Sequence, residues 1–369
     1  MNERKLTYGA SGVDYSRIDP LKLMAQAAAR DTAPNLRAAG YAEIEESRGE
    51  SAYVIDMGDF LLAAITECLG TKALVADAMR ALSGRSHYDS IAQDTIAMAV
   101  NDLVTVGARP LAVHAYWAAG GSSWFDDEER MADLVRGWKA ACNASGVSWG
   151  GGETPSLSGV VCEGAMDLAA SCVGVVRPKE RLTLGERLRA GDAIVILASG
   201  GIHANGITLA RKLAERLPQG YATRIGDGRM YGEALLDPTV LYPKVTEALF
   251  AAGVEIRYMS NITGHGWRKL MRHPAALTYR VTRLPPVPPV LEFLAREAGL
   301  DAREAYGSLN MGAGFAVFVP QAQAALAVET SEREGVRAFH AGRVEAGDKR
   351  VIIEPLGVTF EGESLAVRL

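Results

Sequence analysis

Glycine clusters that follow apolar runs constrain the fold of this chain more than any other feature of its sequence. The 369 residues include 39 glycines. The clusters stand at Gly9–Gly12, Gly70, Gly120–Gly121, Gly150–Gly152, Gly200–Gly206, Gly264–Gly266 and Gly312–Gly314. Glycine alone allows positive φ values and a close approach of backbone to a ligand. Strands that pass through glycine loops into helices indicate an α/β (α+β) fold with ligand-binding loops.

The length and composition indicate two folded domains. The chain is 48% hydrophobic and 22% charged, which provides enough apolar surface for folded cores. Its 369 residues exceed what one core usually supports. A polar break at Arg177–Arg181 places the boundary between a first domain, 1–176, and a second α+β domain, 177–369.

Hydrophobic periodicity predicts the main elements of both domains. A helix over 91–107 would bury Ile96, Val100 and Leu103 in one stripe. The predicted strands lie at 53–66 (as a hairpin), 110–117, 168–176, 193–198, 254–259 and 314–319. The other predicted helices lie at 126–145, 206–216, 238–252, 289–298 and 321–334.

Several classes of function are disfavoured. A net charge of −5 argues against nucleic-acid binding through a broad basic face. The N-terminus has no signal-peptide pattern, and no run of 18 apolar residues predicts a membrane span. Four scattered cysteines fit a reduced, cytoplasmic protein without a zinc knuckle. A small-molecule ligand remains the expectation.

Three motifs in the first domain carry acidic groups. Glu67–Lys72 combines an acid, a glycine turn, a hydroxyl and a lysine, which can hold Mg²⁺ and polyphosphate; the alternative is a strand cap with a solvated Lys72. Asp94–Asp102 places acids on an apolar helix, where ligand binding and N-capping by Asp94 are both open. Gly150–Gly152 before Glu153 is typical of a backbone nest or of a flexible turn.

The second domain contains glycine loops between strands and helices. Ser199–Gly206 would present free N–H groups and the imidazole of His203 to an anion, and the alternative is a simple loop with Asn205 as N-cap. Asn261–Gly266 and Asn310–Gly314 are weaker signals of the same kind.

Taken in order, these stretches resemble the aminoimidazole ribonucleotide synthetase (phosphoribosylformylglycinamidine cyclo-ligase) family, of which the chain looks like a divergent member. The resemblance is carried by Tyr8–Asp14, Glu67–Lys72, Asp94–Pro110, Gly151–Thr154 and Ser199–Gly206, and it extends through Thr263–Gly264 and Asn310–Gly312. It implies two α/β domains, a homodimer whose N-terminal sheets pair into a barrel, and ATP near that interface.

The resemblance also implies the roles of individual residues. Glu67, Asp94, Asp102 and Glu153 would face Mg²⁺. Gly70, Thr71, Lys72, Asn101, Gly151 and Gly152 would contact ATP. His203, Asn205, Thr263 and Gly264 would bind a phosphorylated ribonucleotide. The catalytic groups would be Lys72 and Asp94 at the phosphates and His203 near the transferred protons.

The implied reaction is the ATP-dependent conversion of formylglycinamidine ribonucleotide to aminoimidazole ribonucleotide in purine biosynthesis. The amide oxygen attacks the γ-phosphate, ADP leaves, and an amidine nitrogen closes the ring as phosphate departs. Such chemistry depends mainly on positioning and on neutralising phosphate charge.

The chain departs from the family pattern at three loops, of which the one before His203 lacks the family's proline. Glu67-Cys68-Leu69 replaces the family's Asp-Gly-Val, and His265 replaces the middle glycine of Thr-Gly-Gly-Gly, which predicts strain if φ is positive there. Two alternatives to the cyclo-ligase are therefore open. The chain is either a paralogue that phosphorylates a different small molecule or a non-catalytic nucleotide-binding protein. The selenophosphate synthetase and hydrogenase-maturation branches are disfavoured, because neither segment 8–14 nor the last residues contain cysteine.

Overall fold

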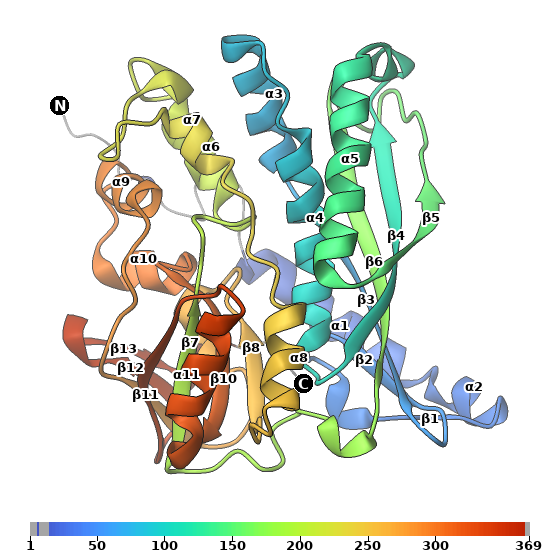
Figure 1. Cartoon of the computed structure of the whole chain (residues 1–369), viewed down its shortest axis with the longest axis vertical. Helices are drawn as coiled ribbons and strands as arrows, with labels where there is room; N and C mark the ends of the chain where they lie inside the picture. Colours follow the sequence, from blue (N-terminus) through green and yellow to red (C-terminus); the bar gives the residue numbers. More distant parts are fainter. Residues whose placement is uncertain (1–5, 7–14, 366–369) are drawn as a thin grey trace.

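The computed structural model describes Leu6 and residues 15–365, which form two α/β domains, each built on one mixed sheet (Figure 1). The segment Tyr8–Asp14 lies outside the described residues. The elements of the first domain are α1 (Tyr15–Arg30), α2 (Ala33–Ala38), β1 (Ala42–Glu43), β2 (Tyr53–Asp56), β3 (Leu61–Cys68), α3 (Lys72–Ser83), α4 (Tyr88–Val104), β4 (Arg109–Ala119), α5 (Glu128–Ser145), β5 (Ser148–Glu153) and β6 (Met166–Val176).

The second domain continues from β7. Its elements are β7 (Asp192–Ala198), α6 (Ile207–Ala214), α7 (Tyr231–Leu235), α8 (Pro243–Ala251), β8 (Tyr258–Asn261), β9 (Leu277–Val281), α9 (Pro289–Glu297), α10 (Ala302–Ser308), β10 (Ala313–Pro320), α11 (Ala324–Arg333), β11 (Ala338–Ala346), β12 (Arg350–Ile353) and β13 (Val358–Glu361). None of the helices that the structure describes is long and apolar enough to cross a membrane.

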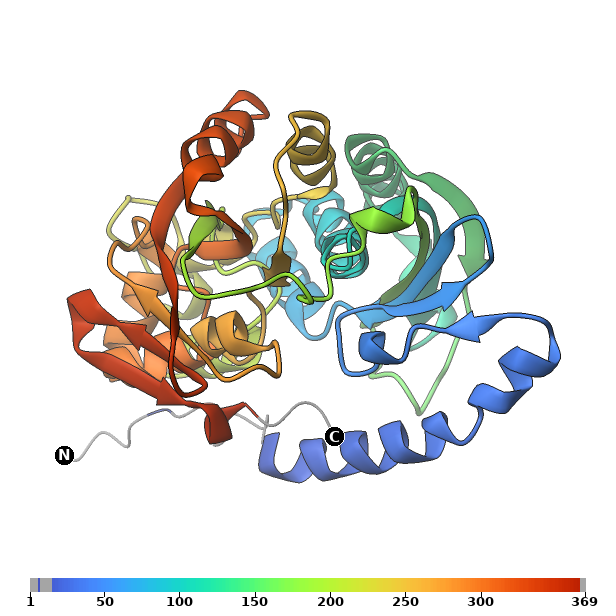
Figure 2. The same ribbon diagram turned by 90° about the horizontal axis from the view of Figure 1, so that it is seen from below.

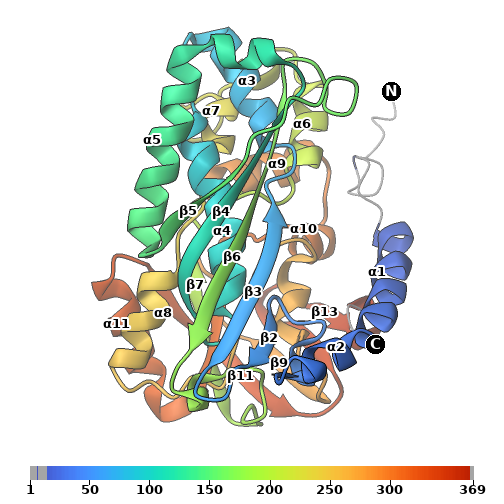
Figure 3. The same cartoon turned by 90° about the vertical axis from the view of Figure 1, so that its right-hand side faces the viewer.

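The first sheet has the strand order β1-β2-β3-β6-β4-β5, antiparallel except for the β4–β5 pair. Helices α4 and α5 cover one face, whereas Figure 3 shows no helix over the opposite face of β3, β6 and β4. The predicted stripe of Ile96, Val100 and Leu103 is completely buried. Burial of these side chains against β3 and β6 places α4 at the centre of the molecule.

The second sheet has the strand order β13-β12-β9-β11-β7-β10-β8. Helices α8 and α11 pack on one of its faces. Val195 and Leu197 of β7 and Phe315 and Val317 of β10 are fully buried there, together with Leu249 of α8. The continuous apolar runs of β7 and β10 reflect burial on both faces of the sheet.

The structure confirms most predicted elements and corrects three. The helix expected over 238–252 begins only at Pro243, because Asp94 and Asn101 of α4 hydrogen-bond the backbone of Thr239 and Val240 in the segment that precedes it. The strand expected at 254–259 is β8, Tyr258–Asn261. Gly150–Gly152 form part of β5 rather than a nest or a turn, since a Cβ on Gly152 would lie 2.1 Å from the carbonyl oxygen of Ala115.

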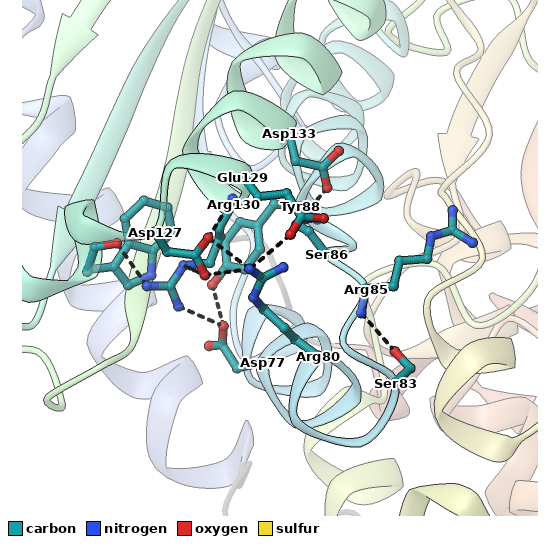
Figure 4. Close-up of polar contacts among 11 residues, drawn as sticks. Asp77, Arg80, Ser83, Arg85, Ser86, Tyr88, Asp127, Glu129, Arg130 and Asp133 are labelled. Carbon is teal, nitrogen blue, oxygen red and sulfur yellow. Dashed lines mark hydrogen bonds and ion pairs between the residues drawn. The ribbon is translucent and has the colours of Figure 1, made fainter.

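A polar network holds the ends of α3, α4 and α5 together (Figure 4). Arg80 of α3 pairs with Asp127 at 2.8 Å, and the hydroxyl of Tyr88 donates to Asp77 at 3.0 Å. The guanidinium of Arg130 donates to the carbonyl of Trp124 at 2.8 Å and stacks 4.2 Å from its ring. These contacts hold α3 in place against the N-terminal ends of α4 and α5.

The contact between α4 and α5 leaves no room for a side chain at Gly137. A Cβ at this position would lie 2.4 Å from Cα of Asp89. We therefore expect Gly137→Ala to lower the free energy of unfolding by about 1–3 kcal/mol through overpacking. Urea denaturation would measure the loss. The control Ala140→Ser, on the exposed face of α5, should stay within about 0.5 kcal/mol of wild type, and equal stability of the two variants would contradict this packing argument.

Candidate functional site

A pocket of about 420 Å³ lies where both domains meet α1. Figure 2 shows α1 running across the base of the molecule, outside both sheets. The pocket is lined by side chains and backbone of Lys22, Gln26, Gly49, Glu50, Ser51, Glu67, Met98, Asp102, Asn205, Thr263, Gly264, His265, Lys269 and Arg272. It therefore gathers the end of β3, one face of α4 and two of the glycine loops.

Two predicted acids line this pocket together. Glu67 stands near the end of β3, and Asp102 projects from α4 and accepts a hydrogen bond from Nδ2 of Asn261 at 2.6 Å. Burial, and then the charge of Asp102, raise the pKa of Glu67 from 4.5 to about 7. Paired carboxylates in a half-closed pocket are a donor set suited to a hard cation.

Basic groups line the same pocket. The side chain of Arg272 pairs with Glu50, at 3.2 Å between Nε and Oε2, and donates to the hydroxyl of Ser51 at 3.0 Å. Lys269 is 9% exposed, and burial, with a further contribution from the charge of Arg272, lowers its pKa from 10.5 to about 8. The pocket is thus mixed in charge, as a site for a metal-bound anion should be.

Side-chain amides join the glycine loops around the pocket. Oδ1 of Asn205 accepts from the backbone N–H of Gly264 at 3.1 Å, which links the 199–206 and 261–266 loops. Asn310 accepts from the hydroxyl of Ser199 at 2.9 Å and donates to the carbonyl of Gly201 at 2.9 Å. The alternative of Asn205 as N-cap is wrong, because Gly206, with φ of 89°, occupies that position.

Lys72 and Asp94 do not line the pocket. Both side chains are fully buried and form an ion pair of 2.7 Å between α3 and α4. Lys72 also donates to the carbonyl oxygens of His203 and Asp237, each at 2.9 Å. Asp94 accepts from the backbone and the hydroxyl of Thr239 at 2.8 and 2.5 Å. In this structure the pair joins the two domains, so the alternatives of a solvated Lys72 and an N-capping Asp94 are both wrong.

Asn101 and His203 are also directed into the interior. The amide of Asn101 donates to the carbonyl of Val240 at 2.8 Å and accepts from the N–H of Tyr242 at 2.9 Å. His203 is 4% exposed, with φ of 59°, and its Nε2 accepts from the N–H of Gly200 at 3.2 Å. Burial, and then the charge of Lys72, lower the pKa of His203 to about 3, so the imidazole is neutral.

The remaining predicted contacts are dispersed. Gly70 forms an exposed turn with φ of 76°, and the hydroxyl of Thr71 lies 3.4 Å from that of Thr208. Gly151, Gly152 and Glu153 are exposed on the edge strand β5. Because β6 and β4 separate β5 from β3, Glu153 lies roughly 14 Å from Glu67 across the sheet.

The four predicted metal ligands are therefore not assembled into one site. Glu67 and Asp102 share the pocket, Asp94 is paired in the interior, and Glu153 stands on the edge strand. Within Leu6 and residues 15–365, no group of three or more His, Cys, Asp or Glu side chains is placed to hold a metal ion.

Seven pocket residues were not expected from the motifs: Lys22, Gln26, Gly49, Glu50, Ser51, Lys269 and Arg272. Lys269 and Arg272 follow the 261–266 loop at a spacing of three residues, a signal that could have identified them. The φ of His265 is 72°, so the condition for strain at this residue is met, and its side chain lines the pocket. Burial lowers the pKa of His265 to about 3, so it contributes a neutral imidazole.

The raised pKa of Glu67 predicts a specific pH dependence of stability. Between about pH 4.5 and 7 the folded protein holds a proton that the unfolded chain releases, so stability falls as pH rises through this window. Asp102, Lys269, Arg272 and Lys22 supply the other charges that act on Glu67. We expect Glu67→Gln to flatten this part of the melting-temperature profile of the ligand-free protein. A profile parallel to that of wild type would refute the assignment.

Comparisons with known proteins cover both domains. Family models described as AIR synthase related protein, N-terminal domain and C-terminal domain, match residues 49–176 and 189–354. The phosphoribosylformylglycinamidine cyclo-ligase of Carboxydothermus hydrogenoformans is 33% identical over 359 residues, which cover 95% of this chain and 99% of that protein.

Two solved structures share the fold at low sequence identity. The hydrogenase maturation protein HypE in complex with ATP aligns with a TM-score of 0.59 and 19% identity, over 81% of this chain and 83% of that chain. Thiamine-monophosphate kinase from Stenotrophomonas maltophilia aligns with a TM-score of 0.58 and 18% identity, over 83% and 90% of the two chains.

Proposed function

Because this chain belongs to the AIR synthase related family, we propose that it is an ATP-dependent cyclo-ligase that converts formylglycinamidine ribonucleotide to aminoimidazole ribonucleotide, with release of ADP and phosphate. The observation that carries this proposal is the pocket where Glu67, Asp102, Asn205 and Thr263 meet. These are residues whose types and order resemble the family pattern. Purine biosynthesis is the corresponding pathway.

The donor set of the pocket fits a magnesium–nucleotide complex better than a bare metal ion. Magnesium is usually bound by one or two carboxylates together with substrate phosphates and water. Glu67 and Asp102 provide the two carboxylates, and nucleotide phosphates would complete the shell. When bound, Mg²⁺ would neutralise charge on the transferred phosphate.

The residues of this chain position the acceptor and exclude water. The amide of Asn205 and the hydroxyl of Thr263 offer hydrogen bonds from two different loops, and α1 covers the pocket with Lys22 and Gln26. Positioning is the main requirement when an amide oxygen attacks a phosphate and a ring then closes. Lys72 donates a hydrogen bond to the carbonyl of His203, and Asp94 pairs with Lys72, so these contacts hold the 199–206 loop in place. Lys72, Asp94 and His203 are therefore positioning residues in this proposal.

A second acceptor class is favoured by one observation. His265 puts an imidazole into the pocket wall at a φ of 72°, at a position where the family has glycine, so it narrows the space for an acceptor. Phosphoryl transfer from ATP to a different small molecule is the corresponding alternative function.

A turnover assay with purified protein separates these functions. ADP and aminoimidazole ribonucleotide formed from Mg·ATP and formylglycinamidine ribonucleotide would support the cyclo-ligase. ADP formed only with another acceptor would favour the second function. Nucleotide binding without turnover in either case would point to a non-catalytic protein and would overturn the proposal.

We further propose a homodimer formed through the uncovered face of the first sheet. Leu62 and Ala64 of β3 are half-buried on the face of the sheet over which no described helix lies (Figure 3). Burial of such a face against a second copy would remove apolar surface from water. Light scattering at micromolar concentration would test this, and a fully active monomer would contradict it.

A further inference from the structure

We propose that Lys269 forms an oxyanion-binding subsite within the pocket, and that this subsite takes a phosphate or carboxylate group of the acceptor. The inference rests on the proposed function and deepens it, since it assigns a binding role to a side chain outside the family-like motifs. Lys269 lies in the 3-10 helix Gly266–Met271, which follows the His265 loop, and it lines the pocket.

The burial and the lack of partners of Lys269 carry the argument. Its side chain lines the pocket and is 91% buried, from an exposed fraction of 9%. Among the described residues, its ammonium group takes part in none of the hydrogen bonds and in none of the ion pairs within 4.0 Å. A buried ammonium without a partner is costly, and an oxyanion supplied by a ligand removes that cost.

Apart from Glu67, which lines the same pocket, the charges near Lys269 are already engaged. Arg272 pairs with Glu50 and donates to the carbonyl of Gly49 at 2.8 Å. Asp102 accepts from Asn261, and Lys22 pairs with Asp19 at 3.5 Å. Among the described basic side chains of this pocket, Lys269 is therefore the one whose ammonium group donates no hydrogen bond. Its three N–H donors are available to an oxyanion.

The competing interpretation is that Lys269 only balances the charges of Glu67 and Asp102. A counter-charge in that role should sit within ion-pair distance of a carboxylate. No such pair exists between Lys269 and an acid in the described part of the chain, whereas Lys72 and Asp94 show what a dedicated pair looks like in this protein, at 2.7 Å. The arrangement favours a ligand over an internal partner.

Calorimetric titration of the nucleotide-free protein with inorganic phosphate, and separately with malonate, tests the subsite. Wild type should bind at least one of these anions, and the one that binds identifies the group as phosphate or carboxylate. Lys269→Met should weaken that binding about tenfold or more, and Lys269→Arg should retain most of it. Lys139→Met, which removes an exposed lysine of α5, is the matched control and should bind as wild type does.

The outcomes are separable from those of the turnover assay, because no nucleotide or acceptor is present. Loss of anion binding in Lys269→Met, with an unchanged melting temperature and retention in Lys269→Arg, would support the subsite. Equal binding by Lys269→Met and wild type, or binding of neither anion by wild type, would overturn it. If Lys269→Met is unstable, Lys269→Gln replaces it under the same criteria.

Discussion

Asp94→Asn is expected to lower the free energy of unfolding by about 3–5 kcal/mol, because it leaves a fully buried lysine without its counter-charge. Asp94 pairs with Lys72 at 2.7 Å, and both side chains are inaccessible to solvent. Asparagine can still accept from Thr239, so the loss isolates the charge of the carboxylate rather than its shape. Urea denaturation followed by tryptophan fluorescence measures it.

Two further variants make this result interpretable. Lys212→Ala breaks an exposed pair with Glu215 and should change stability by no more than about 1 kcal/mol. Lys72→Met combined with Asp94→Leu removes both buried charges and should recover much of the loss. If Asp94→Asn unfolds like wild type but loses turnover at saturating Mg²⁺, the direct metal role first expected for Asp94 is correct, and the structural role assigned above is wrong.

The elements that could be predicted from the sequence are those whose burial is periodic. The stripe Ile96, Val100 and Leu103 repeats every three to four residues, so α4 was recognisable without tertiary information. The strand conformation of Gly150–Gly152 could not be predicted, because it depends on pairing with β4. There the carbonyl oxygen of Ala115 leaves no room for a side chain at Gly152. Tertiary contact, not local propensity, determines that strand.

The candidate site was predictable only in part, for a related reason. Glu67, Asp102, Asn205, Thr263 and Gly264 do meet in one pocket. Lys72 and Asp94 belong to equally conspicuous motifs, yet their charges satisfy each other between α3 and α4. A charged residue on an apolar face needs a partner, but the sequence does not say whether that partner is a ligand or another side chain.

Asp102→Asn is expected to reduce ATP turnover roughly 100-fold, because it removes one of the two pocket carboxylates that are not paired with an arginine. Asp102 is 6% exposed, and an asparagine in its place can still accept the hydrogen bond from Asn261. The melting temperature should therefore stay close to that of wild type, in contrast to Asp94→Asn. Steady-state release of ADP with varied Mg·ATP would measure the effect.

Asp94 and Asp102 are a matched pair for separating turnover from stability. Both stand on α4, eight residues apart, and both accept hydrogen bonds from the second domain. Only Asp102 lines the pocket, so only its variant should separate turnover from stability. Asp59→Asn, in an exposed turn, controls for the loss of a negative charge elsewhere. Unchanged turnover in Asp102→Asn would place the nucleotide outside this pocket, because a cation shared by Glu67 and Asp102 would lose one of its two carboxylate ligands in this variant.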